Sequence, residues 1–200
     1  EKHNLSICTG LPLKKYYRLN KPNKELIKAK VMNLTKNDVD SDDEYLLPKV
    51  KSHQVLAEGL AAWFDYITYR NKDGSIGRNA ELYSQRIAVI DIGGRTTDIA
   101  VIHKGQLEYS RSSTIEAGML NVKDEVKELV RDEFEVEINN EQMHCAIHEG
   151  RIKAWGEWKN VEHIVKVAEE VVCDRIRSEA KRRLKNAADI DVVLFVGGTV

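Results

Sequence analysis

The sequence predicts a mixed α/β fold, in which a sheet that begins with a three-stranded meander is flanked by helices. Between residues 86 and 113, apolar runs rich in β-branched residues are separated by glycine-containing turns, which is typical of consecutive strands. Residues 54–69, 120–133 and 161–185 repeat apolar side chains every three to four positions, which predicts amphipathic helices. The apolar run 192–196 predicts a further, fully buried strand after the last helix.

The composition excludes several classes of protein. Of the 200 residues, 42% are hydrophobic, which is enough to bury a core and argues against a disordered chain. Lys and Arg total 31 against 32 Asp and Glu, so the net charge of -1 provides no general attraction to nucleic acid or to anionic membranes. No apolar run reaches the roughly 18–20 residues of a membrane span, and the three cysteines are far apart. We therefore expect a cytoplasmic protein with no disulfide framework, no direct nucleic-acid contact and no membrane contact.

The first 50 residues alternate short elements with polar turns. Residues 5–8 predict a strand, and Asn23 is placed to cap a helix over 24–29. A strand is predicted over 31–34, followed by the acidic stretch 37–44. That stretch is compatible with a calcium loop, but no glycine or bidentate glutamate stands at the required position, so a solvated hairpin tip is favoured.

Two further elements precede the long helix. Residues 141–148 predict a short helix, and 152–159 predict a polar hairpin. His144 and His148 stand four apart with Cys145 between them, a spacing that can bind metal on one helix face. No third ligand is suitably spaced, so a surface or packing role is favoured.

The most informative stretch follows the apolar strand that ends near Asp91. A carboxylate, two glycines and hydroxyl side chains follow one another at Asp91, Gly93-Gly94 and Thr96-Thr97. This order suits a phosphate site, because glycines let backbone N–H groups approach oxygens closely. The alternative is an ordinary hairpin whose glycines supply positive φ and whose aspartate caps the turn.

Two companion segments favour the phosphate site. The chain reads Phe195-Val196-Gly197-Gly198-Thr199, a strand that opens on two glycines, against which a planar base can lie. Ala117-Gly118 precedes a helix, whose N-terminus is expected to face anionic oxygens. Three glycine segments at strand and helix ends suit a nucleotide.

In order and spacing these segments resemble the actin-like ATPases, a ribonuclease H-like fold, and are most similar to the ParM/StbA plasmid-segregation family. In that superfamily a strand followed by Asp-x-Gly-Gly-x-Thr forms the second phosphate loop, here residues 91–96, and a strand ending in Gly-Gly forms the adenosine motif, here residues 195–198. The opening strand into Leu-Pro-Leu with paired tyrosines is matched by residues 8–13 and 16–17. The similarity extends over nearly the whole chain.

The resemblance implies ATP or GTP with Mg²⁺ as cofactors and assigns individual residues. Asp91 binds Mg²⁺ through water, and a Gln or Glu at the start of the helix connecting the lobes holds the attacking water. Our alignment places that role on Gln54, with Glu58, one turn along the same predicted helix, as the competing assignment. Lys181 and Arg182 are candidates for the base pocket, by analogy with related chaperone ATPases. The residues implied to contact the nucleotide are Gly93, Gly94, Arg95, Thr96, Thr97, Gly118, Lys181, Arg182, Gly197, Gly198 and Thr199.

The resemblance also implies an organisation and a function. Residues 1–51 would be the tail of a first actin-like lobe, and residues 52–200 the connecting helix and a second lobe that ends after the adenosine motif. The parent protein would be an ATPase that polymerises with nucleotide and moves plasmid DNA through an adaptor protein. The alternatives are a chaperone-type switch and a non-hydrolysing interaction module of the same fold. Arg95 departs from the small residue usual at its position, and the first phosphate loop is missing, so the 200-residue chain is expected to be inactive alone.

Overall fold

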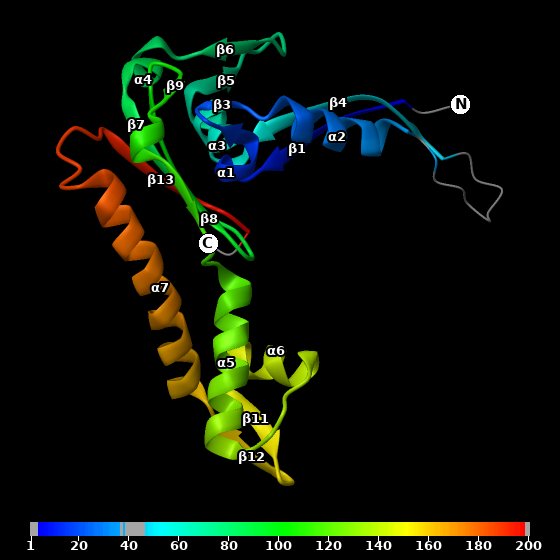
Figure 1. The fold of residues 1–200 in the computed structure, drawn as a ribbon, viewed down its shortest axis with the longest axis vertical. Coiled ribbons are helices and arrows are strands. Elements are labelled where there is room, and N and C mark those ends of the chain that lie inside the picture. Colours follow the sequence, from blue (N-terminus) through cyan, green and yellow to red (C-terminus); the bar gives the residue numbers. More distant parts are fainter. Residues whose placement is uncertain (1–3, 37, 39–46, 199–200) are drawn as a thin grey trace. The chain divides into compact units, whose positions relative to one another are not determined.

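The computed structural model describes residues 4–36, 38 and 47–198, which residue contacts divide into two compact units (Figure 1). The first unit contains the described residues up to 90 together with 98–114 and 189–194. The second unit contains 91–97, 115–188 and the described residues from 195 onward. The boundary expected between residues 51 and 52, which would separate the two lobes of the parent fold, stays a prediction.

In the first unit, two parallel strands carry a capped helix. Strand β1 (Asn4–Leu11) pairs with β4 (Lys49–Ala57), and helix α2 (Lys24–Thr35) contacts β4. As predicted, Asn23 caps α2, since its Oδ1 accepts a hydrogen bond of 3.3 Å from the backbone N–H of Leu26. The predicted strand at 31–34 is wrong: α2 continues to Thr35 because helix elongation is favourable once the first turn is capped. The acidic stretch 37–44, for which a calcium loop and a solvated hairpin tip were considered, lies outside the described residues apart from Asp38.

The chain enters helix α3 (Glu58–Ile67) later than the sequence predicts. We expected the helix to begin at Gln54, but that residue lies in β4 and pairs with Cys8. Every second residue is buried here, at His53, Val55 and Ala57, as in a strand. The sequence of this stretch also fits a helical pattern, but pairing with β1 makes it a strand. The shorter elements of this unit are α1 (Leu13–Tyr16), β2 (Tyr17–Arg18), β3 (Lys21–Pro22), β5 (Thr68–Arg70), β6 (Ile76–Arg78) and α4 (Ala80–Ser84).

A buried carboxylate holds the turn after β1. Asp98 is 2% exposed, and its Oδ2 accepts a hydrogen bond of 2.9 Å from the backbone N–H of Leu13. Its Oδ1 accepts a hydrogen bond from the hydroxyl of Thr114. Asp98 thereby ties the Leu-Pro-Leu segment to the central sheet.

The central sheet has the order β10-β8-β7-β13, with β9 beside β8. Its strands are β7 (Arg86–Ile92), β8 (Thr97–His103), β9 (Gln106–Leu107), β10 (Ser113–Ile115) and β13 (Val192–Val196), and a 3₁₀ turn η1 spans Tyr109–Arg111. The predicted third strand, 107–113, is therefore interrupted: the Ser112 hydroxyl, not a backbone carbonyl, accepts from the N–H of Val101.

Strand β13 is less buried than its apolar sequence predicts. It lies at the edge of the sheet, and Val193 and Phe195 are 39% and 59% exposed. The prediction of a fully buried strand is therefore wrong. The described residues cover only one face of this edge strand, and an apolar sequence does not show which strand lies at an edge.

In the second unit, two helices, a hairpin and a third helix build one core (Figure 1). The elements are α5 (Met119–Phe134), α6 (Asn140–Glu149), β11 (Arg151–Ala154), β12 (Glu157–Asn160) and α7 (Glu162–Leu184). Val122, Val126 and Val130 form the buried stripe of α5, which packs against α7. The predicted helices and hairpin are confirmed to within two residues at each end. None of the described helices combines the length and apolarity needed to cross a membrane.

Candidate functional site

The glycine turn after β7 is fastened to the start of α5. The turn is closed by a hydrogen bond of 2.9 Å from Gly93 N–H to the Thr96 carbonyl. The first two N–H groups of α5 then donate to its carbonyls, Met119 to Gly93 at 3.1 Å and Leu120 to Gly94 at 2.7 Å. The expectation that this helix N-terminus directly faces an anion is therefore wrong, because those donors already hold the turn.

Fastening the turn orients its remaining donors. In a planar trans peptide the N–H points opposite to the C=O. The carbonyls of Gly93 and Gly94 point to α5, so the N–H groups of Gly94 and Arg95 point away from it. Neither Gly93 nor Gly94 has positive φ, so the hairpin alternative does not explain the glycine pair. The turn instead presents two backbone donors at the end of β7.

Two other glycines pack against this turn without room for a side chain. A Cβ on Gly118 would lie 2.4 Å from the Gly93 carbonyl oxygen, and one on Gly197 would lie 2.1 Å from the Ile92 carbonyl oxygen. Gly197 also has a φ of +132°, a backbone conformation that favours glycine. The three glycine segments therefore meet, and the ends of the paired strands β7 and β13 lie together.

A cavity of about 550 Å³ opens beside the turn, within the second unit. Arg95 of the turn and Gly198 of the chain after β13 both line it, and a Cβ on Gly198 would meet nothing within 4 Å. The rest of its lining comes from α5 and α6: Met119, Leu120, Lys123, Asp124, Lys127, Asn140, Met143, His144, Ile147 and His148. Arg95 is ion-paired with Asp124, which leaves Lys123 and Lys127 as the unbalanced charges. The cavity therefore suits an anionic ligand with an apolar part.

Sequence reasoning missed the α5 and α6 residues of this cavity, although a signal was present. Leu120, Asp124 and Lys127 recur at helical spacing on one face of α5, and Asn140, His144 and Ile147 do the same on α6. Only the fold shows that these two faces meet. The rings of His144 and His148 are 4.3 Å apart, and among the described residues no group of three or more His, Cys, Asp or Glu is arranged to hold a metal.

Asp91 stands near the end of β7 as a half-buried carboxylate. Burial raises the pKa of Asp91 above its ordinary value. No hydrogen bond or ion pair to another described residue compensates its charge. A single uncompensated carboxylate fits Mg²⁺, which keeps several of its waters and takes few protein ligands.

Several predicted site residues have other partners. Thr97 is fully buried, and its hydroxyl donates to the Ala117 carbonyl at 2.7 Å, so it serves the packing of the turn and does not face a ligand. Lys181 and Arg182 do not line the cavity, and Arg182 forms an ion pair of 2.6 Å with Glu179. The base-pocket role of those two residues stays a prediction, and neither residue lines this cavity. Thr96 is half-buried in the turn, and Thr199 lies outside the described residues.

The two candidates for orienting water differ in their structural setting. Gln54 is an exposed residue of β4, four positions before the helix begins. Glu58 is the first residue of α3, and its side chain covers Gly10, since a Cβ on that glycine would lie 2.3 Å from Glu58 Cγ. The first position of the helix is therefore Glu58 and not Gln54, while the role of either residue in orienting water stays a prediction.

Comparison with solved structures identifies the fold. Over 96% of this chain and 55% of the other, it is similar to a ParM from a 15-stranded filament of Clostridium botulinum, with 22% identity and a TM-score of 0.72. A non-polymerisable quadruple mutant of pCBH ParM matches over 96% and 57%, with 19% identity and a TM-score of 0.71. An archaeal actin homologue in complex with ADP matches over 94% and 58%, with 15% identity and a TM-score of 0.68. The chain thus has the actin-like fold and spans little more than half of each of these proteins.

Sequence comparison identifies the family. A search of curated proteins gave no match. The model of the family described as archaeal actin homologue MreB-like, C-terminal, matches residues 89–200, more than half of the chain. That range contains the fastened turn, the cavity and the end of β13. The chain therefore belongs to the MreB-like family of archaeal actin homologues, of which it contains the C-terminal domain.

Proposed function

We propose that this chain binds ATP or GTP, as the Mg²⁺ complex, in the second-unit cavity. The observation that carries the proposal is that Arg95, the first turn of α5 and Gly198 line one cavity of about 550 Å³. The outward N–H groups of Gly94 and Arg95 would donate to phosphate oxygens, as glycine loops do. Lys123 and Lys127 add positive charge, and the open backbone at Gly198 leaves room for the base or ribose.

Asp91 is our candidate for the metal. Its carboxylate would hold Mg²⁺ through coordinated water, which relieves the cost of keeping a half-buried charge uncompensated. When bound, Mg²⁺ would neutralise negative charge on the phosphate oxygens while the phosphoryl group is transferred to water. For orienting the attacking water in the parent protein we propose Glu58, because α3 begins there, with Gln54 as the competing candidate. A carboxylate at that position both orients a water and accepts its proton.

We further propose that the parent protein hydrolyses the nucleotide and assembles into filaments. The support is that the chain is similar to a ParM from a filament and to an archaeal actin homologue bound to ADP. The movement of plasmid DNA through an adaptor protein is the finer part of this proposal, supported by the ParM neighbours. Because the chain spans about half of those proteins, we expect it to bind nucleotide but to hydrolyse it poorly by itself.

Nucleotide titration tests the core of the proposal. Fluorescent ATP and GTP analogues would be titrated into the 200-residue chain with and without Mg²⁺. We expect binding that weakens about tenfold in a Lys123→Ala, Lys127→Ala double variant, because two charges at the cavity are lost. A Lys24→Ala, Lys28→Ala variant of α2 in the first unit is the matched control and should bind as the wild type does. Equal affinity in both double variants would refute the assignment of the cavity.

Assembly and hydrolysis are tested on the full-length protein. Light scattering after addition of ATP or GTP distinguishes a filament former from a chaperone-type switch, which stays unassembled. Phosphate release distinguishes either of these from a non-hydrolysing interaction module. A protein that scatters light equally without nucleotide would contradict nucleotide-driven assembly.

A further inference from the structure

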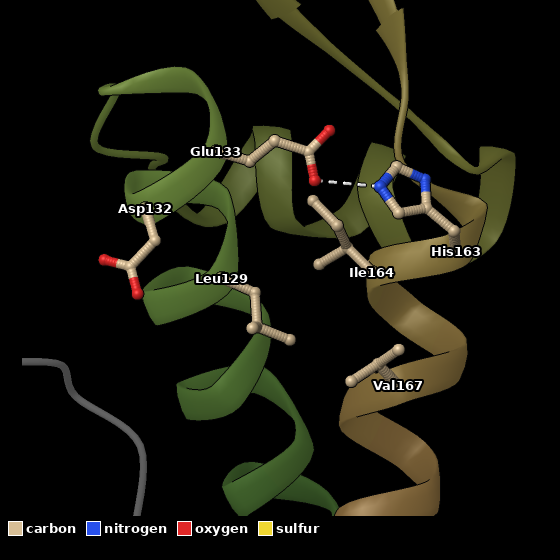
Figure 2. A pocket seen from close by; sticks show the side chains of 6 residues that line it. All are labelled: Leu129, Asp132, Glu133, His163, Ile164 and Val167. Carbon is tan, nitrogen blue, oxygen red and sulfur yellow. Dashed lines mark hydrogen bonds and ion pairs between the residues drawn. The ribbon is translucent and has the colours of Figure 1, made fainter.

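Helices α5 and α7 leave an apolar groove between them at the end of the unit distant from the glycine turn (Figure 2). The groove has a volume of about 350 Å³, and the side chains of Leu129, Ile164 and Val167 point into it. Val167 is 47% exposed although it is a large apolar residue. We call these residues, with Asp132, Glu133 and His163, the α5–α7 groove.

The rim of the α5–α7 groove is acidic. Glu133 accepts a hydrogen bond of 2.9 Å from His163 across one end of the groove. Asp132, whose side chain is 73% exposed, lies beside it on α5, 4.0 Å from the guanidinium of Arg131. The groove therefore favours an apolar side chain that is accompanied by positive charge.

The hairpin of the same unit presents such a group. In residues 151–160, which we call the tryptophan hairpin, Trp155 is 76% exposed and Trp158 is 54% exposed. Trp155 is held outward at the turn by a hydrogen bond of 3.0 Å from its Nε1 to the Phe134 carbonyl. Arg151 and Lys159 are ion-paired within the same copy, with Glu149 at 2.7 Å and Glu157 at 2.6 Å, so Lys153 supplies the remaining positive charge beside the tryptophans. Arg151 stacks over the Trp158 ring at 4.4 Å, whereas the exposed face of Trp155 has no such cover among the described residues. An exposed indole of this kind is typical of an interaction surface.

We propose that the tryptophan hairpin of one copy of this chain docks into the α5–α7 groove of a second copy. The exposed indole of Trp155 provides an apolar group for the open groove, and the cation of Lys153 beside it can face the carboxylates of the groove rim. Tryptophan is also the side chain that contributes most often to the binding energy of protein interfaces. Its own hydrogen bond to Phe134 fixes Trp155 outside the groove of the same copy.

The placement of the two surfaces determines the symmetry of the contact. The hairpin is bonded to Phe134 and the groove rim includes Glu133, so both lie at the same end of α5. Two copies related by a two-fold axis can then exchange hairpins, and the contact closes at two copies. Such a pair differs from the head-to-tail contact that builds a filament, so this inference does not depend on the proposed function.

Sedimentation velocity of the 200-residue chain over a range of concentrations tests the proposal. We expect a monomer–dimer equilibrium with micromolar affinity, because the contact is small. Trp155→Ala and Val167→Arg should each weaken dimerisation about tenfold or more, the first by removing the indole and the second by placing a cation in the groove. Ile76→Ala, an exposed apolar residue of β6 in the first unit, is the control and should leave the equilibrium unchanged. Circular dichroism confirms that each variant is folded.

A mixing experiment tests the two-fold arrangement. Trp155→Ala lacks the indole but keeps the groove, while Val167→Arg lacks the groove but keeps the indole. A mixture of the two should associate more strongly than either variant alone, because one hairpin-to-groove contact is restored. Exchange of charge, with Glu133→Lys and Lys153→Glu combined, should recover association that either change alone loses. A wild-type chain that stays monomeric, or a dimer that neither Trp155→Ala nor Val167→Arg weakens, would overturn the proposal.

Discussion

Replacing Gly118 by alanine should loosen the turn that we assign to phosphate. The added Cβ would lie 2.4 Å from the Gly93 carbonyl oxygen and 2.7 Å from that of Gly94. Both distances are too short, so either the turn or α5 must move. Because φ of Gly118 is -170°, an ordinary extended value, the substitution introduces no backbone strain of its own. The effect therefore isolates the close approach of α5 to the turn.

The magnitude follows from how the clash is relieved. If α5 moves away, the bonds from Met119 at 3.1 Å and Leu120 at 2.7 Å are lost, at about 1 kcal/mol each. If the turn is compressed instead, overpacking costs about 1–3 kcal/mol. These are alternatives, so they do not add. We expect Gly118→Ala to lower the free energy of unfolding by about 1–3 kcal/mol and to weaken nucleotide binding at least tenfold.

Urea unfolding followed by circular dichroism measures the stability, and titration with a fluorescent nucleotide measures the binding. Gly198→Ala is the matched control for stability, since a Cβ there meets nothing within 4 Å. It should unfold at the wild-type midpoint. An unchanged midpoint for Gly118→Ala, together with wild-type affinity, would show that the contact between α5 and the turn has no role in the site.

Three further outcomes are expected. Asp91→Asn should raise the melting temperature of the nucleotide-free chain and abolish the effect of Mg²⁺ on nucleotide binding. Because burial raises the pKa of Asp91, ionisation of this carboxyl costs the folded chain stability as pH rises through the folded pKa. The gain in melting temperature should therefore grow from about pH 4 upward and reach a plateau, in melts recorded at several pH values. In the full-length protein, Glu58→Gln should slow single-turnover hydrolysis at least a hundredfold while Gln54→Ala changes it less than about threefold, and the reverse order would restore the assignment to Gln54. Asp98→Ala should destabilise the first unit by about 2–4 kcal/mol in chemical unfolding, because the N–H of Leu13 loses a buried acceptor; a loss below about 0.5 kcal/mol would contradict that role.

Local sequence patterns predicted most of the elements but not where the chain changes from strand to helix. The helices α5, α6 and α7 follow from apolar spacing, since each buries one stripe against the same core. The start of α3 could not be read in this way, because residues 54–57 fit both a helix and a strand, and pairing with β1 decided between them. Pairing between segments more than forty residues apart has no local signal.

The site was predictable in part for the same reason. Gly93 and Gly197 of the candidate site could be selected from the sequence, because a glycine at a turn or a strand end is a local signal. Lys123 and His144 were missed because only the packing of α5 beside α6 makes them neighbours. Thr97 was misassigned because a hydroxyl after a glycine pair can bond to phosphate or to a carbonyl, and only the fold shows the Ala117 carbonyl within reach.

Helix α5 connects the glycine turn to the α5–α7 groove within the second unit. Its first residues are bonded to the glycine turn, and its last two turns carry Leu129 and Glu133 of the α5–α7 groove. A helix of 16 residues is about 24 Å long, so a tilt of about 5° at the turn would displace its far end by about 2 Å. A displacement of that size is enough to open or close a groove between packed helices. Occupancy of the turn by phosphate and occupancy of the groove by a second copy would then influence each other, and by linkage each would change the affinity of the other by the same factor.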